Sequence, residues 1–167
     1  KWSDGEVVTA ADSVYSFSLA DNPDTPGDKA FVEQTANYQA LDPQTIAWIG
    51  LPGLVSDRPQ DYFWSPLPLH AWSELSTADL LQADASNRSP LGWGAYVLDE
   101  WKSGEFIRLE KNPYYFRANE GLPQFNTLIF KITDTYGDTN LANLKFDREP
   151  FAQFKYDLGE YEEEVKQ

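Results

Sequence analysis

Apolar residues near the start of the chain recur at helical spacing. The four that set the pattern are Ala11, Val14, Tyr15 and Leu19. Spacings of three and four place such residues on one face of a helix. Thr9 and Asp12 form a capping-box pattern just before it, because the hydroxyl can accept a backbone N–H and the carboxylate can reach back. The pattern predicts a helix from about Ala10 to Ala20 that packs on a core through this apolar face.

Three later stretches have the alternation and turn residues of β-structure. Residues 38–41 and 45–49 flank Asp42-Pro43-Gln44, and proline after aspartate favours a type I turn, so this stretch is predicted to be a β-hairpin. Residues 95–101 and 105–111 are separated by Lys102-Ser103-Gly104, which predicts a second hairpin in a half-buried sheet. Residues 128–132 supply a further strand.

Between and after the hairpins the pattern is mixed. Residues 51–70 contain four prolines, too many for a regular strand or helix, so they are expected to form a connection. Ser76 and Asp79 repeat the capping-box pattern and predict a short helix through Leu81. Residues 157–167 are expected to be helical. This order of elements predicts an α+β or α/β fold.

Composition narrows the class of protein. The 167 residues include 27 acidic and 13 basic side chains, for a formal net charge of −14. That charge repels a phosphate backbone, so no nucleic-acid partner is expected. No apolar run approaches the roughly 18 residues that a membrane span requires, and the first residues contain no signal-peptide core. The protein is therefore either cytosolic or secreted with its leader removed.

Catalytic and metal-binding patterns are scarce. The chain has no cysteine and one histidine, His70, for which a hydrogen-bonded structural or surface role is expected. Asp21, Asp24 and Asp28 do not follow the spacing of a twelve-residue calcium loop. No phosphate loop, zinc-protease helix or nucleophile elbow is present. The chain is expected to be no enzyme and to use no metal or cofactor, although an acidic glycosidase domain remains an alternative.

Aromatic side chains are the best candidates for ligand contacts. They make up 15% of the chain, with six tryptophans, and a flat indole can stack on a peptide side chain, a sugar or a cation. Trp64 and Trp93 lie in loops that contain proline or glycine, where side chains often face a ligand. The candidate ligand-binding residues are Trp93, Tyr96, Trp64 and Tyr38.

Four motifs in order resemble the bacterial extracellular solute-binding proteins of family 5, the peptide and nickel importer type. Residues 1–17, KWSDGEVVTAADSVYSF, are similar to its W-S-D-G-x-P-(V/L)-T-A-x-D-V-x-(Y/F)-S-(F/W) stretch. Residues 66–70, PLPLH, resemble its (I/L)-(L/V)-P-K-H. Residues 89–101 and 102–115 resemble P-V-G-T-G-P-Y-x-L-x-E-W and x-x-G-x-x-(I/V)-x-L-x-(R/K)-N-P-x-Y. Trp93, Ala95 and Leu69 depart from the family's usual Thr, Pro and Lys.

The resemblance implies a type II periplasmic-binding-protein fold, of which this chain would be a part lacking the second lobe. Residues 1–75 would form a small side-domain segment with a helix and a hairpin. Residues 76–133 would form part of the first lobe's sheet, and residues 134–167 match the family weakly and are expected to be helical. Because a cleft with one wall cannot desolvate its ligand or close on it, the isolated chain is expected to bind weakly.

The implied function is that of the substrate-binding component of an ABC importer. Such a protein captures an oligopeptide, or else a sugar or a nickel chelate, and delivers it to the permease subunits. The resemblance also implies a monomer that is peripheral to the membrane, periplasmic or extracellular, and anchored to the cell surface as a lipoprotein when full-length. A free-standing, aromatic-rich carbohydrate-binding module is the alternative.

Overall fold

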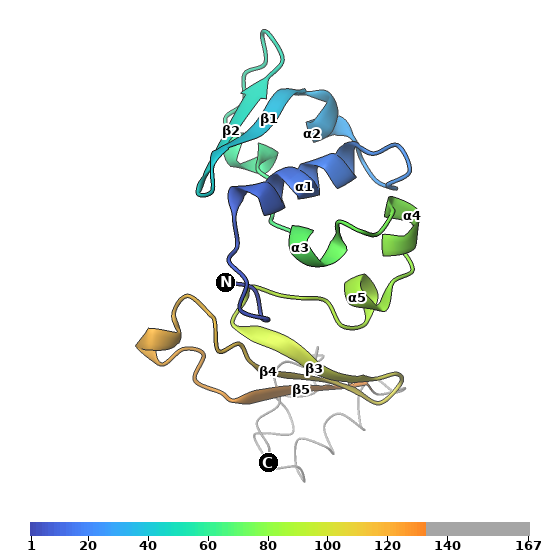
Figure 1. The fold of residues 1–167 in the computed structure, drawn as a ribbon, viewed down its shortest axis with the longest axis vertical. Coiled ribbons are helices and arrows are strands. Elements are labelled where there is room, and N and C mark those ends of the chain that lie inside the picture. The colour runs from blue at the N-terminus through green and yellow to red at the C-terminus, as the bar shows by residue number, and fades with distance from the viewer. Residues whose placement is uncertain (133–167) are drawn as a thin grey trace, which may run out of the picture. The chain divides into compact units, whose positions relative to one another are not determined.

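The computed structural model describes residues 1–132 and divides the chain into two compact units. The first unit is Lys1–Trp93 and the second begins at Gly94. The first contains the helices α1 to α5 and a two-stranded sheet, and the second contains a three-stranded sheet (Figure 1). The mixed α/β composition predicted from the sequence is confirmed. The helix predicted for residues 157–167 lies outside the described residues.

Helix α1 spans Ala10–Asp21, as the sequence predicts. Its capping carboxylate is in place, because Asp12 Oδ2 accepts hydrogen bonds from the Thr9 amide at 2.7 Å and the Thr9 hydroxyl at 3.2 Å. The predicted packing face is only partly right. Ala11 is exposed and Val14, Tyr15 and Leu19 are half-buried, whereas the buried positions of the helix are Ala10, Asp12, Ser13 and Ser16.

The polar packing face of α1 has a physical cause. A loop connection, not another apolar helix, lies against it, and buried loop carbonyls require hydrogen-bond donors. Ser13 Oγ donates to the carbonyl of Trp64 at 2.5 Å and Ser16 Oγ to that of Ser65 at 2.7 Å. Small hydroxyl side chains therefore serve this face better than larger apolar ones.

The first hairpin is confirmed. Strands β1 (Thr35–Asp42) and β2 (Thr45–Gly50) are antiparallel. Their register pairs Tyr38 with Trp48. At the turn Asp42 Oδ1 accepts from the Gln44 amide at 2.8 Å, an interaction that short polar side chains commonly make in turns. Helix α2 (Ala30–Glu33) comes directly before β1.

The proline-containing connection is irregular, as expected, apart from a 3-10 turn at Pro59–Tyr62. Three one-turn helices follow: α3 (Leu69–Trp72), α4 (Thr77–Leu80) and α5 (Asp84–Asn87). The predicted cap of α4 is confirmed, because Ser76 Oγ accepts from the Asp79 amide at 3.1 Å. Among residues 1–132, no helix has both the length and the apolar character needed to cross a bilayer.

The N-terminal turn folds back on itself and buries Trp2, which is only 1% exposed. The Trp2 amide donates to the Glu6 carbonyl at 2.8 Å, and the indole ring lies 6.2 Å from the ring of His70. His70 Nε2 is 2.8 Å from Asp4 Oδ2. The expected hydrogen-bonded role of His70 is confirmed, and it links the first turn to α3.

Asp4 makes the stability of the first unit sensitive to acid. Partial burial works to raise the pKa of Asp4, but hydrogen bonds from His70 and from the Glu6 amide outweigh it, and the pKa lies below its ordinary value of 3.8. A lowered folded-state pKa stabilises the protein above the unfolded value, and this stabilisation is lost as the pH falls through the folded-state pKa. We expect Asp4→Asn to flatten the decline in stability below about pH 4.

Urea denaturation at a series of pH values measures this effect. His70→Asn removes the same hydrogen bond from the other side and is expected to flatten the acid limb in the same way. An unchanged acid limb in His70→Asn would show that the histidine is not the cause.

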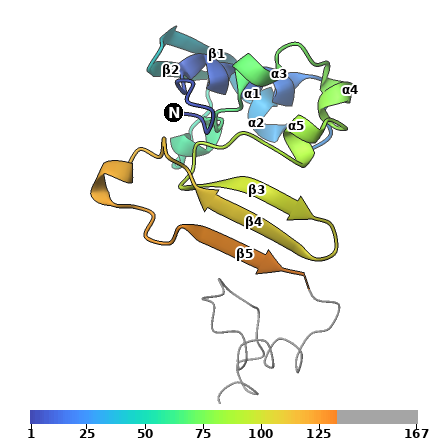
Figure 2. The same ribbon diagram turned by 60° about the horizontal axis from the view of Figure 1, so that its bottom comes forward.

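The second unit contains the sheet β3-β4-β5, built from β3 (Tyr96–Lys102), β4 (Phe106–Lys111) and β5 (Thr127–Lys131) (Figure 2). The second hairpin and the extra strand predicted from the sequence are thus confirmed. The register of β3 against β4 shifts between Leu98 and Glu100, the mark of a bulge.

Two polar side chains organise this sheet. Arg108 on β4 forms ion pairs with Asp99 at 2.5 Å and with Glu100 at 2.9 Å. The hydrogen bond to Asp99 raises the pKa of Arg108 above its ordinary value. Asn112 is fully buried; its amide group donates to the Gly94 carbonyl and its Oδ1 accepts from the Tyr114 amide, both at 2.9 Å. Asn112 therefore fixes the chain where it leaves β4.

Candidate ligand-binding site

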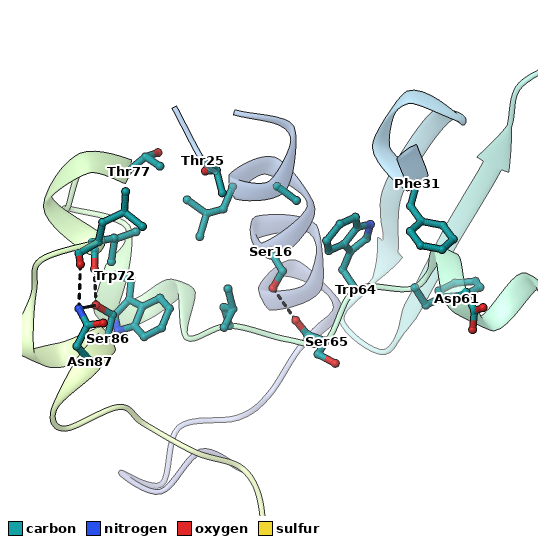
Figure 3. A pocket seen from close by; sticks show the side chains of 16 residues that line it. Ser16, Thr25, Phe31, Asp61, Trp64, Ser65, Trp72, Thr77, Ser86 and Asn87 are labelled. Atoms are coloured by element: carbon teal, nitrogen blue, oxygen red, sulfur yellow. Dashed lines mark hydrogen bonds between the residues drawn. The ribbon is translucent and has the colours of Figure 1, made fainter. Parts of the chain in front are cut away.

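The first unit contains a pocket of about 650 Å³ between α1, the connection that follows the hairpin, and helices α3 to α5. In the close-up of Figure 3, Ser16 and Ser65 lie at its centre, Trp64 and Phe31 toward one end, and Trp72, Ser86 and Asn87 toward the other. The volume falls within the roughly 300–1,000 Å³ that ligand pockets occupy. This pocket is our candidate ligand-binding site.

The wall that carries Trp64 is held in place by α1. Ser13 Oγ and Ser16 Oγ donate to the consecutive carbonyls of Trp64 and Ser65, as described above. The Leu67 amide donates to the Asp12 carbonyl at 3.4 Å, and the Leu69 amide to Asp12 Oδ1 at 3.1 Å. Four contacts from one helix therefore fix this wall of the pocket.

Tyr38, a predicted ligand contact, is placed behind that wall. It is buried on β1, and its hydroxyl accepts from the Trp64 amide at 3.0 Å and lies 2.7 Å from Ser13 Oγ. Its ring stacks on Phe17 at 5.0 Å. The structure thus brings Tyr38 and Trp64 together, with Tyr38 supporting the backbone of the residue whose side chain lines the pocket.

The other two predicted contacts lie elsewhere. Trp93 is 44% exposed at the end of the first unit and is not among the residues that line the pocket. Tyr96 begins β3 in the second unit, where its hydroxyl donates to the Phe125 carbonyl at 3.0 Å. Tyr96 is half-buried.

Sequence reasoning missed other pocket residues, above all Trp72, Phe31 and Leu81. Trp72 follows His70 in α3 and was not distinguished from core tryptophans, because periodicity cannot show which distant segment a four-residue helix faces. The capping box at Ser76 located α4 but not its position opposite α1. Within residues 1–132, no group of three or more His, Asp or Glu side chains is arranged to hold a metal ion.

Comparison with known proteins identifies the class. The family described as bacterial extracellular solute-binding proteins, family 5, middle region, matches residues 1–146 of this chain. The match covers the whole first unit, the second unit as far as residue 146, and all the described residues. The chain belongs to this family, and the resemblance drawn from the four sequence motifs is confirmed.

Individual relatives agree. The oligopeptide-binding protein AppA of Bacillus subtilis is 29% identical over 139 residues, which cover 79% of this chain and 24% of the relative. The periplasmic oligopeptide-binding protein OppA of Escherichia coli is 25% identical over 182 residues, covering 95% of this chain and 33% of that protein. The chain thus spans about a quarter to a third of the length of these relatives.

A solved structure shows the same fold. AppA from Bacillus subtilis in complex with a nonapeptide aligns with 99% of this chain and 32% of its own, with a TM-score of 0.78 and 24% sequence identity. At that identity the likeness supports the fold alone. The fold is that of a type II periplasmic binding protein, of which this chain covers a part, as the resemblance implied.

Proposed function

We propose that this chain is part of the substrate-binding component of an ABC importer, which captures an oligopeptide outside the membrane and delivers it to the permease subunits. The observation that carries the proposal is the family match over residues 1–146, together with relatives named for oligopeptide binding. A pocket already shaped by hydrogen bonds from α1 is consistent with ligand capture, because preorganised walls reduce the entropy lost on binding.

In this proposal the first unit contributes the small side domain and the approach to the first lobe, and the second unit contributes part of that lobe's sheet. Trp64 and Trp93 contact the ligand through their indole rings. Tyr38 and Tyr96 act through the hydroxyl hydrogen bonds described above, which fix the local backbone. The protein works as a monomer at the outer face of the membrane, where its full-length form is anchored.

Calorimetric titration of the gene product that contains this chain with oligopeptides tests the proposal. We expect binding, and we expect Trp93→Ala to weaken it by about tenfold, because aromatic anchors dominate such contacts. Trp101→Ala is the matched control, since Trp101 is 40% exposed on β3 and its replacement is expected to leave affinity within about twofold.

Two outcomes would count against this account. If no oligopeptide binds, the function is wrong. If peptides bind but the two tryptophan variants behave alike, the function stands and the role given to Trp93 does not.

A further inference from the structure

Trp93, a ligand contact in the proposed function, lies between two glycines, Gly92 and Gly94. Glycine has no Cβ and adopts many more backbone conformations than other residues. Among the described residues, no atom lies within 4 Å of the position that a Cβ on Gly94 would occupy. The Trp93 side chain is itself 44% exposed. The direction of the indole therefore depends on what holds the backbone beside it.

Ser3 holds the backbone that leads into Trp93. The Gly92 amide donates to Ser3 Oγ at 3.3 Å, across a separation of 89 positions in the sequence. Both residues belong to the first unit, as Trp93 does. Ser3 is half-buried, and a hydrogen bond that is partly shielded from water is stronger than one that is fully exposed. The bond restrains the glycine immediately before Trp93.

The turn that carries Ser3 is itself fixed on both sides of this residue. Before it, Trp2 is 1% exposed, and the Trp2 amide donates to the Glu6 carbonyl at 2.8 Å. After it, Asp4 Oδ2 is 2.8 Å from His70 Nε2. The Ser3 hydroxyl is therefore an acceptor whose position is set before any partner binds.

Asn112 holds the residues that follow Trp93, within the second unit. Asn112 Nδ2 donates to the Gly94 carbonyl, and the Asn112 amide donates to the Ala95 carbonyl, both at 2.9 Å. Asn112 is 1% exposed, and buried polar groups in native proteins keep their hydrogen-bond partners. With the chain after Trp93 already restrained, the bond from Gly92 to Ser3 removes freedom that the preceding glycine would otherwise have.

We propose that Ser3 is a positioning residue for Trp93. By accepting from the Gly92 amide, Ser3 holds the backbone so that the indole already has its binding direction when an oligopeptide arrives. Restraining a contact residue before binding reduces the entropy that is lost when it becomes ordered in the complex. This inference rests on the proposed function, in which Trp93 contacts the ligand, and adds to it a residue that acts through Trp93.

Calorimetric titration of the gene product with trileucine, trilysine and triglutamate identifies the peptide that binds most tightly, and this peptide is then used with the variants. Ser3→Ala removes the acceptor and is expected to weaken binding by about fivefold, within the range that ordering one side chain on binding costs. Ser3→Thr keeps a hydroxyl at this position and is expected to restore the affinity to within about 1.5-fold.

A double-mutant cycle with Trp93→Ala distinguishes positioning from a general loosening of the first unit. In the Trp93→Ala protein, Ser3→Ala is expected to change the affinity by less than about 1.5-fold, because no indole remains to be directed. A purely structural role for Ser3 would instead weaken binding by the same factor with and without the indole.

Ser56→Ala is the matched control. Ser56 is also half-buried in the first unit, and its Oγ also accepts from a backbone amide, that of Arg58, at 3.1 Å. The control is expected to leave the affinity within about 1.5-fold of the unchanged protein. Circular dichroism of all the variants verifies that the fold is retained.

The outcomes separate the two claims. If peptides bind but Ser3→Ala has the same effect with and without Trp93, or no larger effect than Ser56→Ala, the positioning inference is overturned and the proposed function stands. If none of the three peptides binds, the proposed function fails and the positioning inference fails with it.

Discussion

Replacing Trp2 with alanine is expected to destabilise the first unit by about 3–5 kcal/mol, the cost typical of removing a buried tryptophan. Trp2 is 1% exposed and is among the largest fully buried side chains of the described residues. Its indole packs near His70, so the cavity would open between the N-terminal turn and α3. Urea denaturation followed by circular dichroism measures the loss.

Trp93→Ala provides the comparison for this prediction. Trp93 belongs to the same unit but is 44% exposed, so its replacement is expected to cost less than about 1 kcal/mol. If the two variants lose similar stability, Trp2 is not the packing centre that its burial indicates.

Replacing Asp12 with alanine is expected to destabilise the first unit by about 3 kcal/mol, since hydrogen bonds to a charged acceptor contribute about 1.5–3 kcal/mol each and their donors would be left buried. Asp12 accepts from the Thr9 amide and hydroxyl and, across a long sequence separation, from the Leu69 amide. Thermal and urea denaturation measure the effect.

Asp79→Ala is the control that separates the stability due to helix capping from the stability due to the long-range hydrogen bond of Asp12. Asp79 occupies the same position in the capping box of α4, where it accepts from Ser76 Oγ at 2.6 Å, but it is exposed. Its replacement is expected to cost about 1 kcal/mol or less, as caps on exposed helices do. Equal losses from the two variants would show that the bond to Leu69 adds nothing.

The Asp12 interaction also bears on the ligand site. The segment that it holds leads from Trp64 into α3, and both Trp64 and Trp72 line the pocket. An aspartate in the first turn of α1 therefore positions a wall of the pocket that lies more than fifty residues further along the chain. Loss of Asp12 is expected to loosen the pocket as well as the fold.

Local chemistry made most of the elements predictable. The caps at Thr9 and Ser76 located the starts of α1 and α4, and the turn at Asp42-Pro43-Gln44 located the first hairpin. These signals depend on interactions between residues only a few positions apart, so they can be interpreted without knowledge of the tertiary contacts. The family was predictable too, because its four motifs are short runs of consecutive residues that can be recognised in the sequence.

The face that α1 buries could not be predicted in the same way. Its apolar residues have helical spacing, yet the helix packs through Ser13 and Ser16. What decides this is the loop at Trp64 and Ser65, whose carbonyls need donors once they are buried. A hydrophobic pattern records which side chains avoid water, and it carries no information about which distant backbone groups lack partners.

The candidate site likewise has features that the sequence determined and features that only the tertiary structure decided. The sequence by itself determined the family, the local elements and the presence of aromatic residues in loops, because each depends on residues that are near neighbours in the chain. Only the tertiary structure decided that Tyr38 supports Trp64, and that Trp72 and Leu81 join it around one pocket. Those relations depend on contacts between segments far apart in sequence, where packing and hydrogen-bond satisfaction, not local propensity, choose the partner.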